Sequence, residues 1–339
     1  MVEQSVAKRL VDAVVADFPD HAPGTRPVHT IGIGVTGHFK ATTVARDYCT
    51  AEHFQGQDVP VTVRFSNGSG SPVQHDGWSD ARGMATRFHL AQEGATDLIG
   101  MTICEFFAPT VEEFLAFSAS ARMSPVARES GWAKIVDMLH LKMPLPDPMP
   151  GQRRSGAPGS MVFANHHRST QIAAIEAATI GAPSSYARAT YSAVHSFVVT
   201  APDATRRHVR FQWRPVAGIK LIDPTQAGDD RYLHGELRAR LAHWPAQFLL
   251  VMTIGEDGDD VADPTTPWPL KRRRIVMGSL TLTTVAADQQ RDCERIAFNP
   301  CRLVPGIDLS DDPILAARRD AYEVSREERH GTPCPFHSA

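Results

Sequence analysis

The chain has 339 residues, of which 42% are hydrophobic and 22% are charged, and its formal net charge is -3. That balance is typical of a globular protein with an ample apolar core, and it gives no sign of a nucleic-acid or membrane partner. None of the 5 cysteines forms a C-x-x-C pair and no apolar run is long enough to cross a membrane, so we expect a cytoplasmic protein without a disulfide framework or zinc site.

The first third of the chain predicts one helix followed by strands. Apolar residues recur at helical spacing over residues 5–18, which predicts an amphipathic helix. The prolines and the glycine of F-P-D-H-A-P-G-T-R-P then end it. From about 28 to 108, short β-branched runs such as V-P-V-T-V-R-F-S are separated by Gly, Asp, Asn or Pro, and these runs predict strands.

The rest of the chain alternates between blocks of helix and blocks of strand. We expect helix over 109–140, a long loop over 143–162, helix over 168–180, strands at Y-S-A-V-H-S-F-V-V-T and H-V-R-F-Q-W-R-P, helix over 233–242 and then the strand Q-F-L-L-V-M-T-I. A long helix is expected from Pro313 onward. Because strands and helices are segregated, the pattern predicts the α+β class and not alternating βαβ units.

Residues 26–40, R-P-V-H-T-I-G-I-G-V-T-G-H-F-K, contain Gly32, Gly34 and Gly37 in the spelling G-x-G-x-x-G. In a dinucleotide-binding fold this pattern follows a buried strand, opens a helix and has an acid about 20 residues further on. Glu52 satisfies the last condition, but the residues on either side satisfy neither of the others. We therefore interpret the glycines as places where a strand bends or approaches something closely.

Several motifs follow the order that they have in haem catalases, and the chain resembles that family. R-P-V-H and the glycine stretch are similar to the family's distal-histidine strand, and V-T-V-R-F-S and D-A-R-G-M-A-T-R-F are similar to the segments that follow it. D-L-I-G-M-T-I-C-E-F-F resembles D-L-V-G-N-N-T-P-x-F-F. Further matches are H-S-F (195–197), F-Q-W (211–213), D-P-T-x-x-W-P (263–269), I-A-F-N-P-C-R-L-V-P-G-I (296–307) and D-D-P-I-L-A-A-R-R-D-A-Y (311–322).

The resemblance is strongest to the short, catalase-related peroxidase branch. It implies an antiparallel β-barrel core with surrounding helices, and haem b as the cofactor. We expect a single haem domain over 1–339, with an N-terminal helix within 1–20, a core over 26–329 and a flexible tail over 330–339. Since the long N-terminal arm of a typical catalase is not matched, a homodimer is expected in place of an interlocked tetramer.

On one face of the haem, the resemblance assigns Tyr322 as the iron ligand and Arg318 as its partner. Arg318 precedes Tyr322 by four residues in the expected helix, so the two side chains share one face. Ferric iron and a nearby cation both favour an ionised phenol. An electron-donating phenolate suits peroxide chemistry better than oxygen carriage.

On the other face, the resemblance assigns His29 as the acid–base residue. It would take a proton from the peroxide and hand it to the leaving oxygen. Ser66 would hydrogen-bond the other ring nitrogen and fix the tautomer, and Val28 would narrow the pocket. Phe114 maps to a ring-stacking position, and three further residues, Arg26, Arg64 and Arg329, map to partners of the haem propionates, whose carboxylates match the guanidinium fork.

The sequence departs from catalases at the second N of G-N-N-T-P, where this chain has Thr102. A threonine hydroxyl is shorter than the amide of asparagine and can be taken up by the backbone. We therefore assign Thr102 to the catalytic pocket but expect weak catalase activity. The expected reaction is reduction of hydrogen peroxide or organic hydroperoxides through a ferryl intermediate, with electrons from a small-molecule donor.

Two alternatives stay open. One is a haem enzyme that rearranges fatty-acid hydroperoxides, like allene oxide synthase. That relative has a threonine directly before the distal histidine, where this chain has Val28. The other is a non-enzymatic haem-binding protein, which would need Tyr322 and the arginines but not His29.

Overall fold

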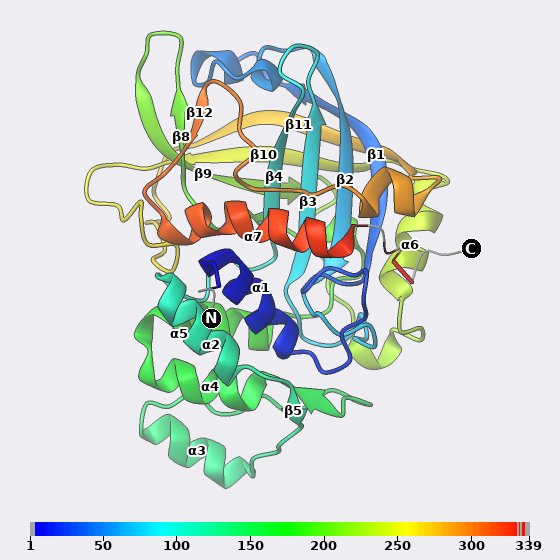
Figure 1. The fold of residues 1–339 in the computed structure, drawn as a ribbon, viewed down its shortest axis with the longest axis vertical. Coiled ribbons are helices and arrows are strands. Elements are labelled where there is room, and N and C mark those ends of the chain that lie inside the picture. Colours follow the sequence, from blue (N-terminus) through cyan, green and yellow to red (C-terminus); the bar gives the residue numbers. More distant parts are fainter. Residues whose placement is uncertain (1–3, 331, 333, 336–339) are drawn as a thin grey trace.

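An antiparallel β-barrel forms the centre of the computed structural model, which describes residues 4–330, 332 and 334–335 (Figure 1). Within this part of the chain eight strands close into a ring, since β10 pairs with both β9 and β11 and β11 pairs with β1. In ring order they are β1 (Gly32–Ala41), β2 (Asp58–Asn67), β3 (Arg82–His89), β4 (Ala95–Met101), β7 (Tyr191–Ser192), β9 (Arg206–Pro215), β10 (Ala246–Ile254) and β11 (Arg274–Val285). The pairing confirms the α+β class and the barrel.

Two further strands extend the barrel beside β9, namely β8 (Phe197–Thr200) and β12 (Ile307–Leu309). A separate pair of short strands joins β5 (Ser124–Pro125) to β6 (Arg154–Ser155). Large side chains fill the barrel, as in other small barrels. Phe39 and Phe88 meet edge to face at 5.2 Å, and both also contact Trp213.

The helices lie outside the barrel and cover one side of it (Figure 1). They are α1 (Val6–Ala16), α2 (Val111–Ser120), α3 (Gly131–Leu139), α4 (Ala157–His166), α5 (Arg168–Thr179), α6 (Tyr232–Leu241) and α7 (Pro313–Arg329). The first and last of these, α1 and α7, pack against each other although they stand at opposite ends of the sequence. Four of these helices begin with a side chain that accepts a backbone N–H in the first turn: Ser5 for α1, Thr110 for α2, Ser130 for α3 and Asp312 for α7.

Several sequence predictions differ from the structure in detail. The expected helix over 109–140 is two helices, α2 and α3, and the expected loop over 143–162 contains the start of α4 at Ala157. Pro158 in the first turn of α4 explains how a Pro- and Gly-rich segment forms a helix, because its missing N–H is not needed there. The expected tail is only partly described: Cys334 is buried and its N–H donates to Gln290, whereas 331, 333 and 336–339 lie outside the described residues.

The glycine pattern lies within β1 and not at a strand-to-helix turn. A side chain at Gly37 would meet the backbone oxygen of Thr281 at 2.0 Å, and the pairing register shifts between Thr36 and Gly37. Gly37 therefore permits a close approach of β1 to β11 at this irregularity in the strand pairing. His29 lies three residues before β1, outside any strand.

Among the described residues, no helix combines the length and the apolar character needed to cross a membrane.

Candidate active site

A cavity of about 390 Å³ lies between the barrel and the helices α1, α2 and α7. Strands β2, β3 and β4 form its floor, and α1 contributes Leu10, Val11 and Val14 to its wall. The polar end of its wall comes from α7, whose Arg318, Tyr322 and Arg329 repeat at helical spacing and so lie on one face.

The cavity brings together residues that the sequence scatters over 304 positions. Its lining includes Arg26, Val28, His29, Arg64, Ser66, Phe114, Arg318, Tyr322 and Arg329, which are the predicted site residues with one exception. That exception is Thr102. The ring of Phe114 stacks on Phe106 with a centroid distance of 5.4 Å, so an aromatic surface forms part of the wall.

Tyr322 is the end of a chain of hydrogen bonds. Arg318 Nη2 donates to the Tyr322 hydroxyl at 2.6 Å, and Arg318 Nη1 lies 2.7 Å from His195 Nε2. Because a guanidinium can only donate, Nε2 must be the unprotonated nitrogen of His195. Its Nδ1 therefore carries the proton and donates to Asp312 Oδ2 at 2.6 Å. Burial lowers the pKa of His195, which favours this neutral ring although Asp312 opposes the shift.

Asp312 also joins this series of hydrogen bonds to the start of α7. Its other oxygen, Oδ1, accepts the backbone N–H groups of Ile314 and Leu315 and so begins α7. One carboxylate thus anchors both the helix that carries Tyr322 and the network that reaches its hydroxyl. A cationic donor held at 2.6 Å stabilises an ionised phenol, which is the form that binds ferric iron.

His29 is held in an unusual conformation on the opposite side. Its φ of 56° lies in the left-handed region, which few non-glycine residues adopt and which is common at functional sites. The backbone N–H of His29 donates to the Gly68 carbonyl, and Arg64 Nη1 donates to the backbone carbonyl of His29. The ring nitrogen Nδ1 lies 3.0 Å from the Ser66 hydroxyl.

A glycine provides the space for this ring. A side-chain carbon at Gly83 would come within 2.8 Å of both the His29 ring and the Ser66 hydroxyl. Ser66 and Gly83 face each other in the β2–β3 pair, so the strand register itself places the His29 ring against the floor of the cavity. The lack of a side chain at Gly83 therefore leaves room for the His29 ring beside Ser66.

The pKa of His29 is lowered to about 3, first by burial and then by repulsion from Arg64 and Arg318. A lowered pKa means that the neutral ring, the form able to accept a proton, persists as the solution is acidified. We expect the rate constant for reaction of the haem-loaded protein with hydrogen peroxide to stay level from about pH 8 to about pH 5, across the usual histidine range. Stopped-flow spectroscopy measures it. A decline centred near about pH 6.5 would show that His29 titrates normally.

Three arginines converge at one end of the cavity. Arg26 and Arg64 both pair with the buried carboxylate of Glu294, and Arg64 Nε donates to it at 2.8 Å. Arg329 Nη1 donates to the Glu294 carbonyl at 3.0 Å but forms no ion pair with a carboxylate in the described part of the chain. Burial, followed by repulsion from Arg64, lowers the pKa of Arg329 to about 10. Three guanidiniums around one carboxylate are suited to further anionic groups.

Thr102 is turned away from the cavity. Its hydroxyl accepts the Arg82 N–H at 2.8 Å, and its own N–H donates to the Arg82 carbonyl. The neighbouring Met101, the last residue of β4, lines the cavity in its place. The structure therefore places a thioether, which cannot donate a hydrogen bond, where the sequence analysis placed a hydroxyl.

Sequence reasoning did not assign roles to four of these residues. His195 and Asp312 lie in quoted motifs, and an Asp directly before Pro313 is a recognisable helix start. Glu294 gave no signal, because Arg26 and Arg64, which donate to its carboxylate, lie 268 and 230 positions away in the chain. Met101 was missed because a shift of one residue decides which side chain of a strand faces the cavity.

These residues fit a haem group. An apolar and aromatic wall suits the porphyrin, the buried guanidiniums suit its propionates, and the Tyr322 oxygen, contacted by Arg318, would be the ligand for ferric iron. His29, neutral and fixed by Ser66, lies in the same cavity and is available to a small ligand.

Comparison with known proteins agrees with this site. The catalase family profile matches residues 11–144 and 160–335. A catalase-related peroxidase of Mycolicibacterium paratuberculosis is 30% identical over 91% of this chain and 90% of its own length. A catalase-related peroxidase of Synechococcus elongatus is 28% identical over 90% of this chain and 84% of its own. Catalase-2 of Bacillus subtilis is 29% identical over 92% of this chain, which spans 46% of that longer protein.

The profile covers nearly the whole chain, including both the segment with His29 and the helix with Tyr322. The barrel, the cavity and these matches support one conclusion: the chain belongs to the catalase family.

Proposed function

We propose that this protein is a haem b-dependent peroxidase that reduces hydrogen peroxide or organic hydroperoxides with electrons from a small organic donor, by a ferryl route and with weak catalase activity. Membership of the catalase family makes the chain an oxidoreductase that acts on peroxide. The proposal of weak catalase activity rests on the residues near His29 in the cavity. The imidazole of His29 is neutral, and Met101, which also lines the cavity, has no amide that could donate a hydrogen bond.

Haem would supply the redox chemistry when bound, held by Tyr322 and by the cluster of Arg26, Arg64 and Arg329. The chain's own residues would then move protons. With Nδ1–H donating to Ser66, the free Nε2 of His29 accepts the peroxide proton and returns it to the departing oxygen. The leaving group is then water or an alcohol in place of a poorer anion. The chain from Asp312 through His195 and Arg318 keeps the Tyr322 oxygen in its electron-rich form.

A second cavity supports the organic substrates in this proposal. It has a volume of about 280 Å³ and shares Phe18, Phe107 and Phe117 with the first. The remaining wall includes Val126, Leu145 and Met161 from the segments around α3 and α4, so it offers an apolar surface to a bulky peroxide.

The experiment that tests the proposal follows three products in one reaction mixture. Haem-loaded protein receives hydrogen peroxide or cumene hydroperoxide together with a phenolic donor. Peroxide loss, oxygen release and oxidised donor are then measured together. A peroxidase consumes peroxide in proportion to oxidised donor and releases little oxygen, whereas a rearranging enzyme consumes the organic peroxide without oxidising donor.

The substitution Met101→Asn is expected to raise the oxygen released per hydrogen peroxide consumed by up to about tenfold. Dismutation requires a second peroxide to be oriented in the pocket, and one added hydrogen bond contributes about 0.5–1.5 kcal/mol. The oxygen electrode measures this ratio. Thr102→Val is the matched control: it removes the acceptor for the Arg82 N–H and should cost about 1 kcal/mol of stability, with oxygen release unchanged. A larger effect on oxygen release from Thr102→Val than from Met101→Asn would contradict this assignment.

A further inference from the structure

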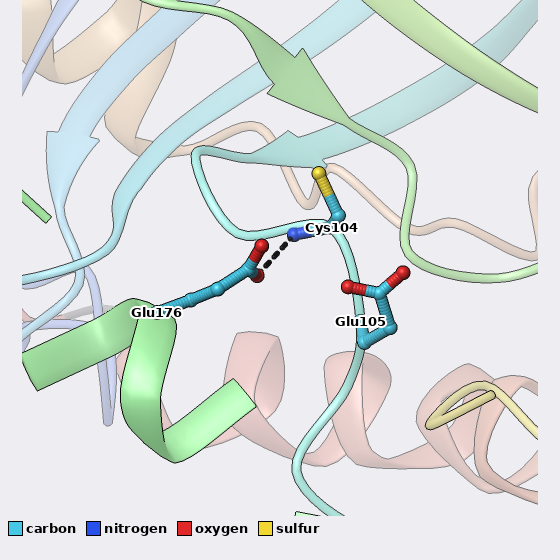
Figure 2. A group of neighbouring side chains, drawn as sticks. All are labelled: Cys104, Glu105 and Glu176. Atoms are coloured by element: carbon cyan, nitrogen blue, oxygen red, sulfur yellow. Dashed lines mark hydrogen bonds between the residues drawn. The ribbon is translucent and has the colours of Figure 1, made fainter. Parts of the chain in front are cut away.

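A cluster of three potential metal ligands lies outside the cavity described above. Cys104 and Glu105 belong to the loop that follows β4, and Glu176 comes from the last turn of α5 (Figure 2). One ligand atom from each, the Cys104 sulfur and one oxygen from each carboxylate, lies within 4.8 Å of the others. None of these three side chains has a role in the proposed peroxidase reaction.

Glu105 is the side chain that points to a missing ligand. It is only 7% exposed, and no hydrogen bond or ion pair within the described chain reaches its carboxylate. One of its carboxylate oxygens lies within 4.8 Å of the Cys104 sulfur and of a Glu176 oxygen. Leaving a carboxylate buried without a partner is costly, so such groups are normally hydrogen-bonded, paired or metal-bound.

The nearest charges do not complete the Glu105 environment. Arg210 is the cation that acts on Glu105, but its guanidinium lies over the Trp268 ring at 4.7 Å and donates to the Asp263 carbonyl. Glu176 is a second anion and adds repulsion.

The other two side chains are already oriented. Glu176 accepts the Cys104 N–H at 2.8 Å, which fixes the loop to α5 and leaves its second oxygen available. The Cys104 sulfur lies 3.6 Å from the Ser192 hydroxyl, and that hydroxyl accepts a hydrogen bond from Gln212. Since Ser192 is already an acceptor there, its own O–H can donate to the sulfur, as groups around metal-bound thiolates commonly do.

We propose that Cys104, Glu105 and Glu176 bind one divalent cation of the zinc type and thereby tie the loop that follows β4 to α5. A thiolate selects against Mg²⁺ and Ca²⁺, whereas Zn²⁺ accepts sulfur and carboxylate oxygen together. Three protein ligands leave a fourth position for water. Binding forms one Zn–S bond and releases the thiol proton to solvent, so no oxidant or reductant is needed.

A cation bound by Cys104, Glu105 and Glu176 would affect the cavity through the residues that directly follow Glu105. Phe106 and Phe107 directly follow Glu105 and both line the cavity. Phe106 also contacts the His195 ring, with a centroid distance of 5.4 Å. Zinc would therefore stabilise one wall of the pocket without touching peroxide or haem.

The test uses haem-loaded full-length protein incubated with zinc sulfate and then dialysed. We expect one zinc per chain by elemental analysis, and a zinc-edge X-ray absorption spectrum, which does not sense haem iron, with one sulfur at about 2.3 Å and oxygens at about 2.0 Å. Cys104→Ser, Glu105→Gln and Glu176→Gln should each weaken zinc binding at least about tenfold in competition with a chromophoric chelator. In Glu176→Gln the amide oxygen can still accept the Cys104 N–H, so that variant should retain its fold.

Two variants serve as controls, since Cys301→Ser removes another partly exposed thiol and Glu112→Gln another exposed acid. Both should bind zinc as the parent protein does. Zinc should also raise the melting temperature of the parent and of these controls, but not of the cluster variants. The proposal is overturned if no zinc is retained, if its shell contains no sulfur, or if the cluster variants bind it as tightly as the parent. Peroxidase activity is not a readout, so failure here leaves the proposed function intact.

Discussion

Replacing His29 with alanine in the haem-loaded protein is expected to slow the first reaction with hydrogen peroxide by at least about a hundredfold, the effect of losing a general acid–base catalyst. In the proposed mechanism the neutral ring is the base in the cavity, and its Nδ1 lies 3.0 Å from the Ser66 hydroxyl. Alanine leaves no group there that can take the peroxide proton and return it. The rate constant for loss of the ferric spectrum after stopped-flow mixing measures the effect.

A second variant is needed because the backbone of His29 is in the left-handed region. Alanine is strained at a φ of 56°, whereas asparagine adopts this region more readily and is not a base. His29→Asn should therefore show the same loss of rate in a protein that folds normally. His38→Ala, on the exposed side of β1, is the matched control and should react as the parent does. If His29→Asn binds haem and reacts at the parental rate, the acid–base assignment is wrong and a non-enzymatic haem-binding role gains support.

Replacing Tyr322 with phenylalanine is expected to weaken haem retention at least about tenfold and to remove the ferric spectrum typical of phenolate ligation. The ring is kept, so the packing of α7 changes little. What is lost is the oxygen that Arg318 contacts at 2.6 Å. Transfer of haem to an excess of apomyoglobin measures retention, and the absorption spectrum reports the ligand.

The control for this experiment is Tyr48→Phe. Tyr48 packs against the main core cluster and lies under the guanidiniums of Arg207 and Arg273, and it does not line the cavity that contains Tyr322. Its haem retention and spectrum should match those of the parent. An unchanged spectrum in Tyr322→Phe would mean that another residue holds the iron.

The sequence predicted those parts of the site that depend on local spacing. Arg318 and Tyr322 are four residues apart in a helix that begins at an Asp-Pro pair, so their shared face followed from helical geometry. The barrel strands followed from β-branched runs, but their closure into a ring depended on the resemblance to a family. Closure rests on the pairing of β10 with β9, which local patterns do not report.

Other parts of the site could not be predicted because they depend on register or on distant contacts. Thr102 and Met101 differ by one position, yet the first bonds the backbone of Arg82 and the second faces the cavity. The pairing of Arg26 with Glu294 spans 268 positions in the chain. The left-handed conformation of His29 arises from the contacts that fix its N–H and carbonyl, and no pattern around Pro27 indicates it.

The most direct test of the account is a haem titration of the purified protein, followed by addition of peroxide. We expect one haem per chain and a high-spin ferric spectrum, then conversion by one equivalent of peroxide to an oxidised species that a phenolic donor returns to the ferric form. Tyr322→Phe should lose the initial spectrum and His29→Asn the conversion. Failure to bind haem at a defined ratio would contradict the proposed function and would leave the arginine cluster around Glu294 without the anion that it is built to receive.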